Sequence, residues 1–461
     1  MTATRVPTDE GLSAALADTL HGALQGGLPS VVVSSAKLRL LHTIRVSMTS
    51  RDLPPAVLAW NAVSADSGSC AVIGRTQRLS GPDAAFVNAV AAHSSLKEDC
   101  GPGGLREGSH PGTYVVPAAL AAAEMSGASG SDLLRGIIMG YEAVSRLGAA
   151  SPPGIGQRRF RPVGIMGAFG AAAAAGGVWG LDRTALSRAL AIAANMAGGV
   201  NQGIFDGTME PYFHSGIGAR NGLLAAQLAR AGAITSDRSL EGDFGFFQTY
   251  GGAAGSEDLL VGARDDFGVT RVGTKRFAAC LQNQETIALI TDTVPGGIDV
   301  RDIVRVTIRR PATGTNGLES PGVSRIPPYS NMLQAQMSAR FTAAAALSGA
   351  PVDDATYFRD CFADSGVTAL AGRIELENST DGSVRVEIEL IDRVITLDSD
   401  VSNTVFPEAA EIRTRFYRDV AAHIGADAAE ELLRLVDSID EDVPVSHLTA
   451  ALCAPTATAA S

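Results

Sequence analysis

Twenty consecutive residues without a charged side chain constrain this chain more than any other feature. They run from residue 162 to residue 181, PVGIMGAFGAAAAAGGVWGL, between Arg161 and Asp182. The length would span a bilayer, but Ala and Gly dominate and large apolar side chains are few, unlike a membrane helix. Because small side chains let helices approach closely, we expect a helix buried among other helices and no membrane as partner.

Helical patterns dominate the first 265 residues. Apolar side chains recur at helical spacing, and Ala-rich stretches alternate with polar, Gly-rich breaks. The expected helices cover residues 12–24, 34–48, 84–93, 116–125, 131–147, 167–179, a stretch that begins at Asp182, and 222–232. Helices with so many small side chains pack tightly, which favours a multilayer bundle.

The pattern changes near residue 266. Residues 301–310, RDIVRVTIRR, alternate apolar and charged side chains, as a half-buried strand does. Residues 373–390 indicate two further strands around an Asn/Asp/Gly turn. Residues 338–347 are helical, and residues 407–439 are helical again.

A helical stretch that follows an α+β segment suggests that the chain returns to its first domain. We therefore expect a mainly α protein. Its large all-helical domain would be built from both chain ends, residues 1–265 and 405–461. Residues 266–404 would form a smaller α+β lid domain.

Composition excludes several classes of protein. The chain has 37 basic and 49 acidic residues, a net charge of −12, and 46% hydrophobic residues, so it is neither disordered nor suited to nucleic acid or an anionic membrane. Its five Cys form no CxxC pair and its seven His no HExxH motif, so we expect no disulfide framework and no metal site. The first twenty residues lack the apolar core of a signal peptide, which predicts a cytoplasmic protein.

Nucleotide and serine-hydrolase motifs are also missing from the sequence. No GxGxxG follows a strand, and there is no Walker motif and no GxSxG. Only three residues are Lys, namely Lys37, Lys97 and Lys275, among many Arg. A GC-rich genome explains the bias, but each remaining Lys is a functional candidate because Lys, unlike Arg, can lose its proton.

Four polar, Gly-rich loops could carry chemistry. Residues 93–112 contain Lys97, Glu98, Asp99, Cys100, Arg106, Glu107 and His110; residues 152–164 contain Arg158, Arg159 and Arg161; residues 201–216 contain Gln202, Asp206, Glu210 and His214; and residues 273–284 contain Lys275. Taken singly, each loop is as easily an ordinary connector with solvated charges. Taken together, they supply acids, bases and carboxylate-binding groups, which suits proton transfer on an acidic small molecule.

Several runs resemble the MmgE/PrpD family, which includes 2-methylcitrate dehydratase, cis-aconitate decarboxylase and iminodisuccinate epimerase. They are HPGTYVVPAALAAAE, GIIMGYEAVSRLG, GAFGAAAAAGGVWGLD, HSGIGARNGLLAAQLARAG and TKRFAAC. The resemblance implies a helical domain with an α+β lid, a site between the two, a homodimer, and chemistry that needs no cofactor. In that chemistry a base removes a proton next to a carboxylate, and an acid assists a leaving group or reprotonates carbon.

The resemblance carries over unevenly to individual residues. His110 in SHPG, Lys275 in TKRF and Asp99 match family positions, whereas Leu96 replaces an acid and Arg161 replaces a His. The family's Lys shortly before the HxG run is missing from EPYFH, residues 210–214, and Phe341 stands where cis-aconitate decarboxylases have a Tyr.

From these matches and departures we predict a site. The predicted catalytic residues are His110, Lys275, Glu210 and Asp99, and the predicted substrate-binding residues are Arg161, Lys97, Cys100, Gln202 and Phe341. His110 is the first choice for acid or base because it titrates near neutral pH. Arg161 cannot act as a base but can bind a carboxylate. Glu210 would take over acid–base duty, with a raised pKa if the cleft is dry.

The predicted function is that of a cofactor-free lyase or isomerase acting on a small carboxylate-bearing substrate. The departures from the family pattern suggest a rewired member that serves a specialised or secondary-metabolic pathway. Dehydration, decarboxylation, epimerisation and cyclisation share the first step, so all four stay open. Two alternatives also stay open. One is a non-catalytic binding or scaffold protein on the same fold. The other is an enzyme for a more apolar substrate, suggested by Leu96, Phe160 and Phe341.

Overall fold

The computed structural model describes residues 11–25, 27–101, 109–260, 266–313, 317–320, 322–399, 404–441 and 443–453. Its helices are α1 (Leu12–Leu24), α2 (Ser30–Ser50), α3 (Pro54–Val63), α4 (Gly81–Ser94), α5 (Gly112–Ser126), α6 (Gly130–Ala150), α7 (Gly154–Gln157), α8 (Pro162–Val178), α9 (Arg183–Met196), α10 (Gln202–Asp206), α11 (Glu210–Arg230), α12 (Phe246–Gly251), α13 (Gln284–Thr293), α14 (Met332–Met337), α15 (Ala339–Leu347), α16 (Ala355–Cys361), α17 (Ser365–Ala371), α18 (Ala409–Ile424), α19 (Ala426–Asp437) and α20 (Val445–Leu452). The strands are β1 (Asp99–Cys100), β2 (Gly273–Thr274), β3 (Ile303–Arg310), β4 (Ile374–Asn378), β5 (Val384–Leu390) and β6 (Val394–Ser399). The protein is mainly α, as expected.

Helix α8 is the uncharged stretch, and it lies at the centre of the helical part. Every residue from Val163 to Val178 is buried, and the helix packs against α5, α6, α9 and α11. Glycine makes these contacts possible: a Cβ on Gly222 of α11 would lie 2.4 Å from the carbonyl oxygen of Ala168. The expected buried helix is confirmed. Across the described residues, no helix combines the length and the hydropathy that crossing a bilayer requires.

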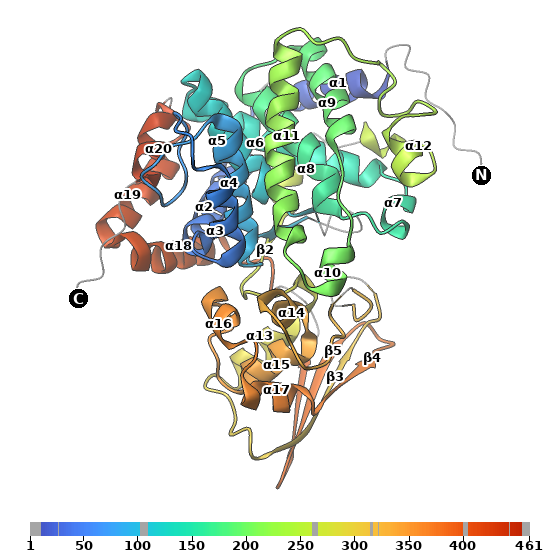
Figure 1. Ribbon diagram of the computed structural model, residues 1–461, viewed down its shortest axis with the longest axis vertical. Helices are drawn as coiled ribbons and strands as arrows, with labels where there is room; N and C mark the ends of the chain where they lie inside the picture. Colours follow the sequence, from blue (N-terminus) through green and yellow to red (C-terminus); the bar gives the residue numbers. More distant parts are fainter. Residues whose placement is uncertain are drawn as a thin grey trace.

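A small mixed sheet lies at the other end of the molecule (Figure 1). Its order is β4-β3-β5-β6, with β4 parallel to β3 and the other pairs antiparallel. The expected strand at 301–310 is confirmed as β3. The two strands expected in residues 373–390 are confirmed as β4 and β5. They do not pair with each other, because both pair with β3 and flank it.

Both chain ends contribute to the helical layers. Helix α18 packs on α2, and α20 packs on α5. One cluster of buried apolar side chains joins residues between Leu16 and Val272 to residues between Phe416 and Leu452. A second cluster is formed mostly by residues between Phe277 and Leu397. The boundaries at 265 and 405 stay a prediction.

Candidate active site

Five charged or titratable side chains from three segments that are distant in the sequence line one cavity of about 230 Å³. They come from the loops before α5 and α8, and from the segment that follows β2. The lining residues are Leu96, Glu98, His110, Arg161, Pro162, Asn201, Ile204, Lys275, Cys280, Leu281, Gln282, Ser320 and Met337. The cavity thus lies where β2 and α10 approach the lower part of the molecule in Figure 1.

The pairing of β1 with β2 brings two of these side chains together. Asp99 pairs with Thr274 and Cys100 with Gly273 in an antiparallel ladder, so Glu98 and Lys275 lie at its adjacent ends. A side chain at Gly273 would not fit, because its Cβ would lie 2.6 Å from the carbonyl oxygen of Val405. The Lys275 ammonium donates a hydrogen bond to the Glu98 carboxylate, and both side chains are buried.

Glu98 is the centre of the charged cluster. Burial raises its pKa above the usual value for Glu, although Lys275 opposes that effect. One carboxylate oxygen, Oε1, binds Lys275 and lies 3.6 Å from Nδ1 of His110 and 3.7 Å from Nδ1 of His93. The other, Oε2, is buried and has no hydrogen-bond partner among the described residues.

The geometry around His110 decides its tautomer. Nδ1 lies 2.6 Å from the backbone carbonyl oxygen of Asp99, which can only accept a hydrogen bond, so Nδ1 carries the proton. The neutral ring then has an unprotonated Nε2 that can accept a proton. Burial, followed by the charges of Lys275 and Arg161, lowers the pKa of His110 well below its usual value. The ring is therefore neutral at pH 7 and ready to act as a base.

Arg161 precedes α8 and supplies the second cation of the cavity. Its Nη2 donates to Nε2 of His93 at 3.3 Å, while its Nε has no partner among the described residues. Burial lowers the pKa of His93 well below its usual value, so this ring is neutral as well. One cation paired with Glu98 and one without a counter-ion leave the cluster with a net charge near +1, which suits an anionic ligand.

Asp99 and Lys97 lie beside the cavity without lining it. The Asp99 carboxylate accepts hydrogen bonds from the Gly112 N–H at 3.0 Å and the Tyr141 hydroxyl at 2.6 Å, and burial raises its pKa to about 6. Its side chain therefore anchors the start of α5, and only its backbone carbonyl reaches His110. The Lys97 ammonium donates to the Asp353 carbonyl at 2.7 Å, away from the cavity.

The structure does not support the predicted acid–base role of Glu210. Glu210 is exposed in the first turn of α11, and a hydrogen bond from Thr208 is the main cause that lowers its pKa. The expectation of a raised pKa is wrong, because the carboxylate is solvated and not enclosed in a dry cleft. Gln202 is also exposed, and its amide donates to Asp206 at 2.9 Å.

Cys100 and Phe341 are buried in apolar surroundings. Cys100 packs with Leu281 and Val405. Phe341 lies on α15, where its ring meets the ring of Tyr329 edge-on with centroids 5.1 Å apart. Neither residue belongs to the cavity lining. Of the nine predicted site residues, the lining includes His110, Lys275 and Arg161.

From the sequence, Glu98 was named among the loop residues without being selected for the site, and His93 and Cys280 were not singled out. Glu98 precedes Asp99 directly, and neighbouring side chains of an extended segment point to opposite sides. Asp99 was selected for the site because it matches a family position, and Glu98 was left out. Which of the two acidic side chains faces Lys275 decides the site, and no local sequence pattern indicates this. Cys280 lines the cavity, and its thiol contacts Oε1 of Gln282 at 2.6 Å.

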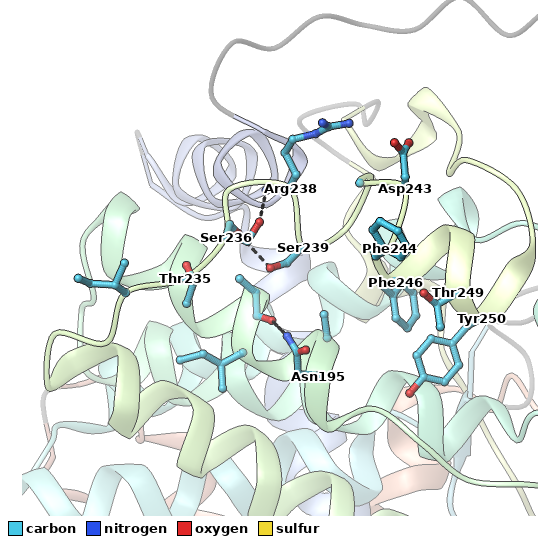
Figure 2. A pocket seen from close by; sticks show the side chains of 16 residues that line it. Asn195, Thr235, Ser236, Arg238, Ser239, Asp243, Phe244, Phe246, Thr249 and Tyr250 are labelled. Carbon is cyan, nitrogen blue, oxygen red and sulfur yellow. Dashed lines mark hydrogen bonds between the residues drawn. The ribbon is translucent and has the colours of Figure 1, made fainter.

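A larger pocket of about 960 Å³ lies elsewhere, next to α9 and α12. Figure 2 shows Asn195, Ser236, Ser239 and Tyr250 around it. Its described lining contains Arg238 and Asp243 as charged residues but no His, Lys or Cys. Because only the smaller cavity gathers Glu98, His110, Arg161 and Lys275, we assign the candidate active site to it. Within the ranges that the structure describes, His, Cys, Asp and Glu form no group of three that could hold a metal ion.

Comparison with known proteins gives the family. Human cis-aconitate decarboxylase is 25% identical over an aligned length of 478, which covers 97% of this chain and 95% of that protein. A cis-aconitate decarboxylase-like protein of Aspergillus oryzae is 27% identical over 54% of this chain and 53% of its own length. Mouse cis-aconitate decarboxylase is 29% identical over 52% of this chain and 50% of its own length. The family model for the MmgE/PrpD N-terminal domain matches residues 14–257, more than half of the chain, and the protein therefore belongs to the MmgE/PrpD family.

Proposed function

We propose that this protein is a lyase that moves protons on a small carboxylate-bearing substrate, by chemistry of the decarboxylase or dehydratase kind and without a cofactor. The relatives named cis-aconitate decarboxylase support the reaction class. The single observation that carries the proposal is the state of His110: Nδ1 is committed to the Asp99 carbonyl, and Nε2 is left to accept a proton in a cavity that also contains Arg161 and Lys275.

The proposed steps follow from these groups. Arg161 binds a carboxylate of the substrate, and the contact orients the neighbouring C–H bond toward His110. Nε2 of His110 takes the proton, and the electron pair of the C–H bond moves into the carboxylate-conjugated system. Arg161 and Lys275 stabilise the negative charge that develops. In a dehydration, protonated His110 or Lys275 then supplies the proton with which hydroxide leaves as water. In a decarboxylation the C–CO2 bond breaks instead of the C–H bond, CO2 leaves, and the carbon that retains the electron pair takes a proton from Lys275.

Three further expectations belong to the same proposal. The α+β part, residues 266–404, acts as a lid over the helical part, because the cavity lining combines residues such as Arg161 and Lys275 from both. We expect a homodimer, as the family resemblance implies, and, separately, a cytoplasmic location. The reaction needs no metal and no organic cofactor.

An enzyme for a more apolar substrate is the second candidate. Leu96, Ile204, Leu281 and Met337 line part of the cavity, so a ligand with an apolar carbon skeleton would find matching walls. Phe160 and Phe341, which first suggested this alternative, are not among the lining residues. A scaffold without catalytic function receives no support from a specific contact.

Proton exchange tests the proposal. The protein is incubated in D2O with cis-aconitate, citrate and a set of mono- and dicarboxylic acids, and loss of C–H signal is followed by NMR. We expect exchange or turnover for at least one acid, and loss of both in His110→Gln. Glu210→Gln is the matched control, since it alters an exposed residue outside the cavity. If no acid exchanges, or if His110→Gln exchanges as fast as the control, the proposal is wrong.

A further inference from the structure

We propose that Glu98 limits how many carboxylates the substrate can carry: one is held by Arg161, and a second is accepted only when Glu98 takes up a proton. The preferred substrates are then mono- or dicarboxylates on an apolar skeleton and not tricarboxylates. The inference rests on the proposed function, because it specifies the substrate of that same cavity.

The charges of the described lining lead to this limit. Its cations are Arg161 and Lys275, and its anion is Glu98. Lys275 is already neutralised by Glu98, so Arg161 alone has charge to offer. A first carboxylate would bring the cluster close to neutrality, whereas each further carboxylate would add an uncompensated negative charge to an enclosed site.

The size and polarity of the cavity agree with a small ligand. Its volume of about 230 Å³ is below the range of roughly 300–1,000 Å³ that is usual for ligand pockets. The remaining lining is neutral, and it includes Leu96, Ile204, Leu281 and Met337. These walls can contact methyl and methylene groups, but they offer nothing to a third carboxylate.

Two buried polar atoms without partners belong to side chains that line the cavity. Arg161 Nε and Glu98 Oε2 are both buried, and neither has a hydrogen-bond partner among the described residues. Arg161 Nε can donate a hydrogen bond to a carboxylate whether or not Glu98 is protonated. Oε2 can only accept while Glu98 is ionised, so it repels a second carboxylate; once protonated, it donates a hydrogen bond and Lys275 becomes available as a counter-ion.

The surroundings of Glu98 keep protonation within reach. Lys275, His93, His110, Arg161 and Tyr212 are the charged or titratable groups around it. Burial raises the pKa of Glu98. The pKa values of both His residues lie well below the usual value, and that of Tyr212 is raised, so none of these three rings titrates between pH 6 and 8. Asp99, whose pKa is raised to about 6 by burial, and the second carboxyl group of the ligand also titrate in this range. A rise in affinity for dicarboxylates on acidification therefore reports Glu98 only if Glu98→Gln abolishes it.

Binding of three unreactive acids tests the inference. Tricarballylate, methylsuccinate and isobutyrate share one skeleton, in which each lost carboxymethyl arm is replaced by a methyl group. Isothermal titration calorimetry at constant ionic strength would be done at pH 8 and pH 6, in two buffers of different ionisation enthalpy, to count protons taken up. For the wild type at pH 8 we expect methylsuccinate to bind no tighter than isobutyrate and tricarballylate to bind weakest. At pH 6 methylsuccinate should gain about tenfold, with uptake of a proton.

The variant Glu98→Gln isolates the cause. It removes the negative charge while retaining the shape, so methylsuccinate should bind at least about tenfold tighter at pH 8 relative to isobutyrate, and the pH dependence should vanish. Glu210→Gln changes the net charge of the protein equally at an exposed position, and its ranking of the acids should match the wild type. If Glu98→Gln does not fold, ethane-1,2-disulfonate replaces methylsuccinate with the wild type and with Asp99→Asn, because its sulfonates stay ionised and any proton taken up on binding then enters the protein. Uptake that persists in Asp99→Asn supports the inference, and the absence of uptake overturns it.

Several outcomes would overturn the inference. These are tightest binding of tricarballylate by the wild type at pH 8, an unchanged ranking in Glu98→Gln, or no binding of any of the three acids. Proton exchange tests the proposed function separately. If the ranking is as expected but no acid exchanges protons, the inference about Glu98 holds for a binding cavity and the proposed catalysis is wrong. Conversely, turnover of a tricarboxylate with tight binding would retain the proposed function and refute the limit set by Glu98.

Discussion

Replacing Lys275 by Met would leave Glu98 buried without its cation. The methionine retains most of the side-chain volume, so the loss is mainly electrostatic. Removing one member of a buried ion pair costs about 3–5 kcal/mol of stability. The two His rings near Glu98 are neutral and cannot replace the ammonium group. We therefore expect the full cost at pH 8.

The expected change in melting temperature follows from the length of the chain. Unfolding entropy is about 2.1 cal/mol/K per residue near the melting point, which for 461 residues is about 1 kcal/mol/K. If the chain unfolds as one unit, Lys275→Met should lower Tm by about 3–5 °C. Lys37→Met is the matched control, because Lys37 forms a more exposed ion pair with Asp440. Such surface pairs contribute about 0–1 kcal/mol, so its Tm should fall by less than about 1 °C.

The cost of Lys275→Met should depend on pH. Without Lys275 the pKa of Glu98 rises further, so between its unfolded and folded pKa values the native state binds more protons than the unfolded state. Stability of the variant then falls as pH rises through this window and recovers as pH falls. Differential scanning calorimetry or thermal circular dichroism at pH 5.5 and pH 8 would measure the difference. A Tm at pH 8 within about 1 °C of the wild type, or a deficit that grows on acidification, would refute the reasoning.

Four further predictions concern single residues. His110→Gln should slow proton exchange by about 10²–10⁴-fold without lowering Tm markedly, as expected for loss of a general base; NMR exchange rates within tenfold of the wild type would contradict this. Because the pKa of His110 is lowered, the base stays unprotonated at neutral pH, and the acid limb of kcat/KM should lie below the ordinary histidine pKa of about 6.5; an acid limb at or above that value would exclude His110 as the base. The pKa of Lys97 is lowered to about 8, so between about pH 8 and the unfolded value of about 10.4 the unfolded state binds more protons than the native state. The stability of the wild type therefore gains on that of Lys97→Met as pH rises, and the difference between their Tm values should increase from pH 7.5 to pH 10. A constant difference would disprove this prediction. Phe341→Tyr adds a hydroxyl within the apolar packing around α15 and should lower Tm by about 1–3 °C with kcat/KM unchanged within about threefold; a clear gain in decarboxylation would show that the residue contacts substrate.

Local sequence patterns determined much of the architecture. The Ala and Gly of residues 162–178 predicted the buried helix α8, because only small side chains permit the approach that Gly222 and Ala168 show. The alternation in residues 301–310 predicted β3, because side chains along a strand alternate between its two faces. The family resemblance, together with residue chemistry, led to His110, Lys275 and Arg161, which the structure brings to one cavity although they lie far apart in the sequence.

Long-range packing decided the rest. Glu98 and Asp99 are neighbours of the same type, and only the pairing of β1 with β2 turned Glu98 toward Lys275, 177 residues away. Long-range packing also decided the surroundings of Glu210, because α11 exposes this residue to solvent. A local pattern specifies which face of an element is apolar, because that depends on residues a few positions apart. Which element covers that face, and which side chain it thereby buries beside a charge, depends on contacts between distant segments and is settled only when the chain has folded.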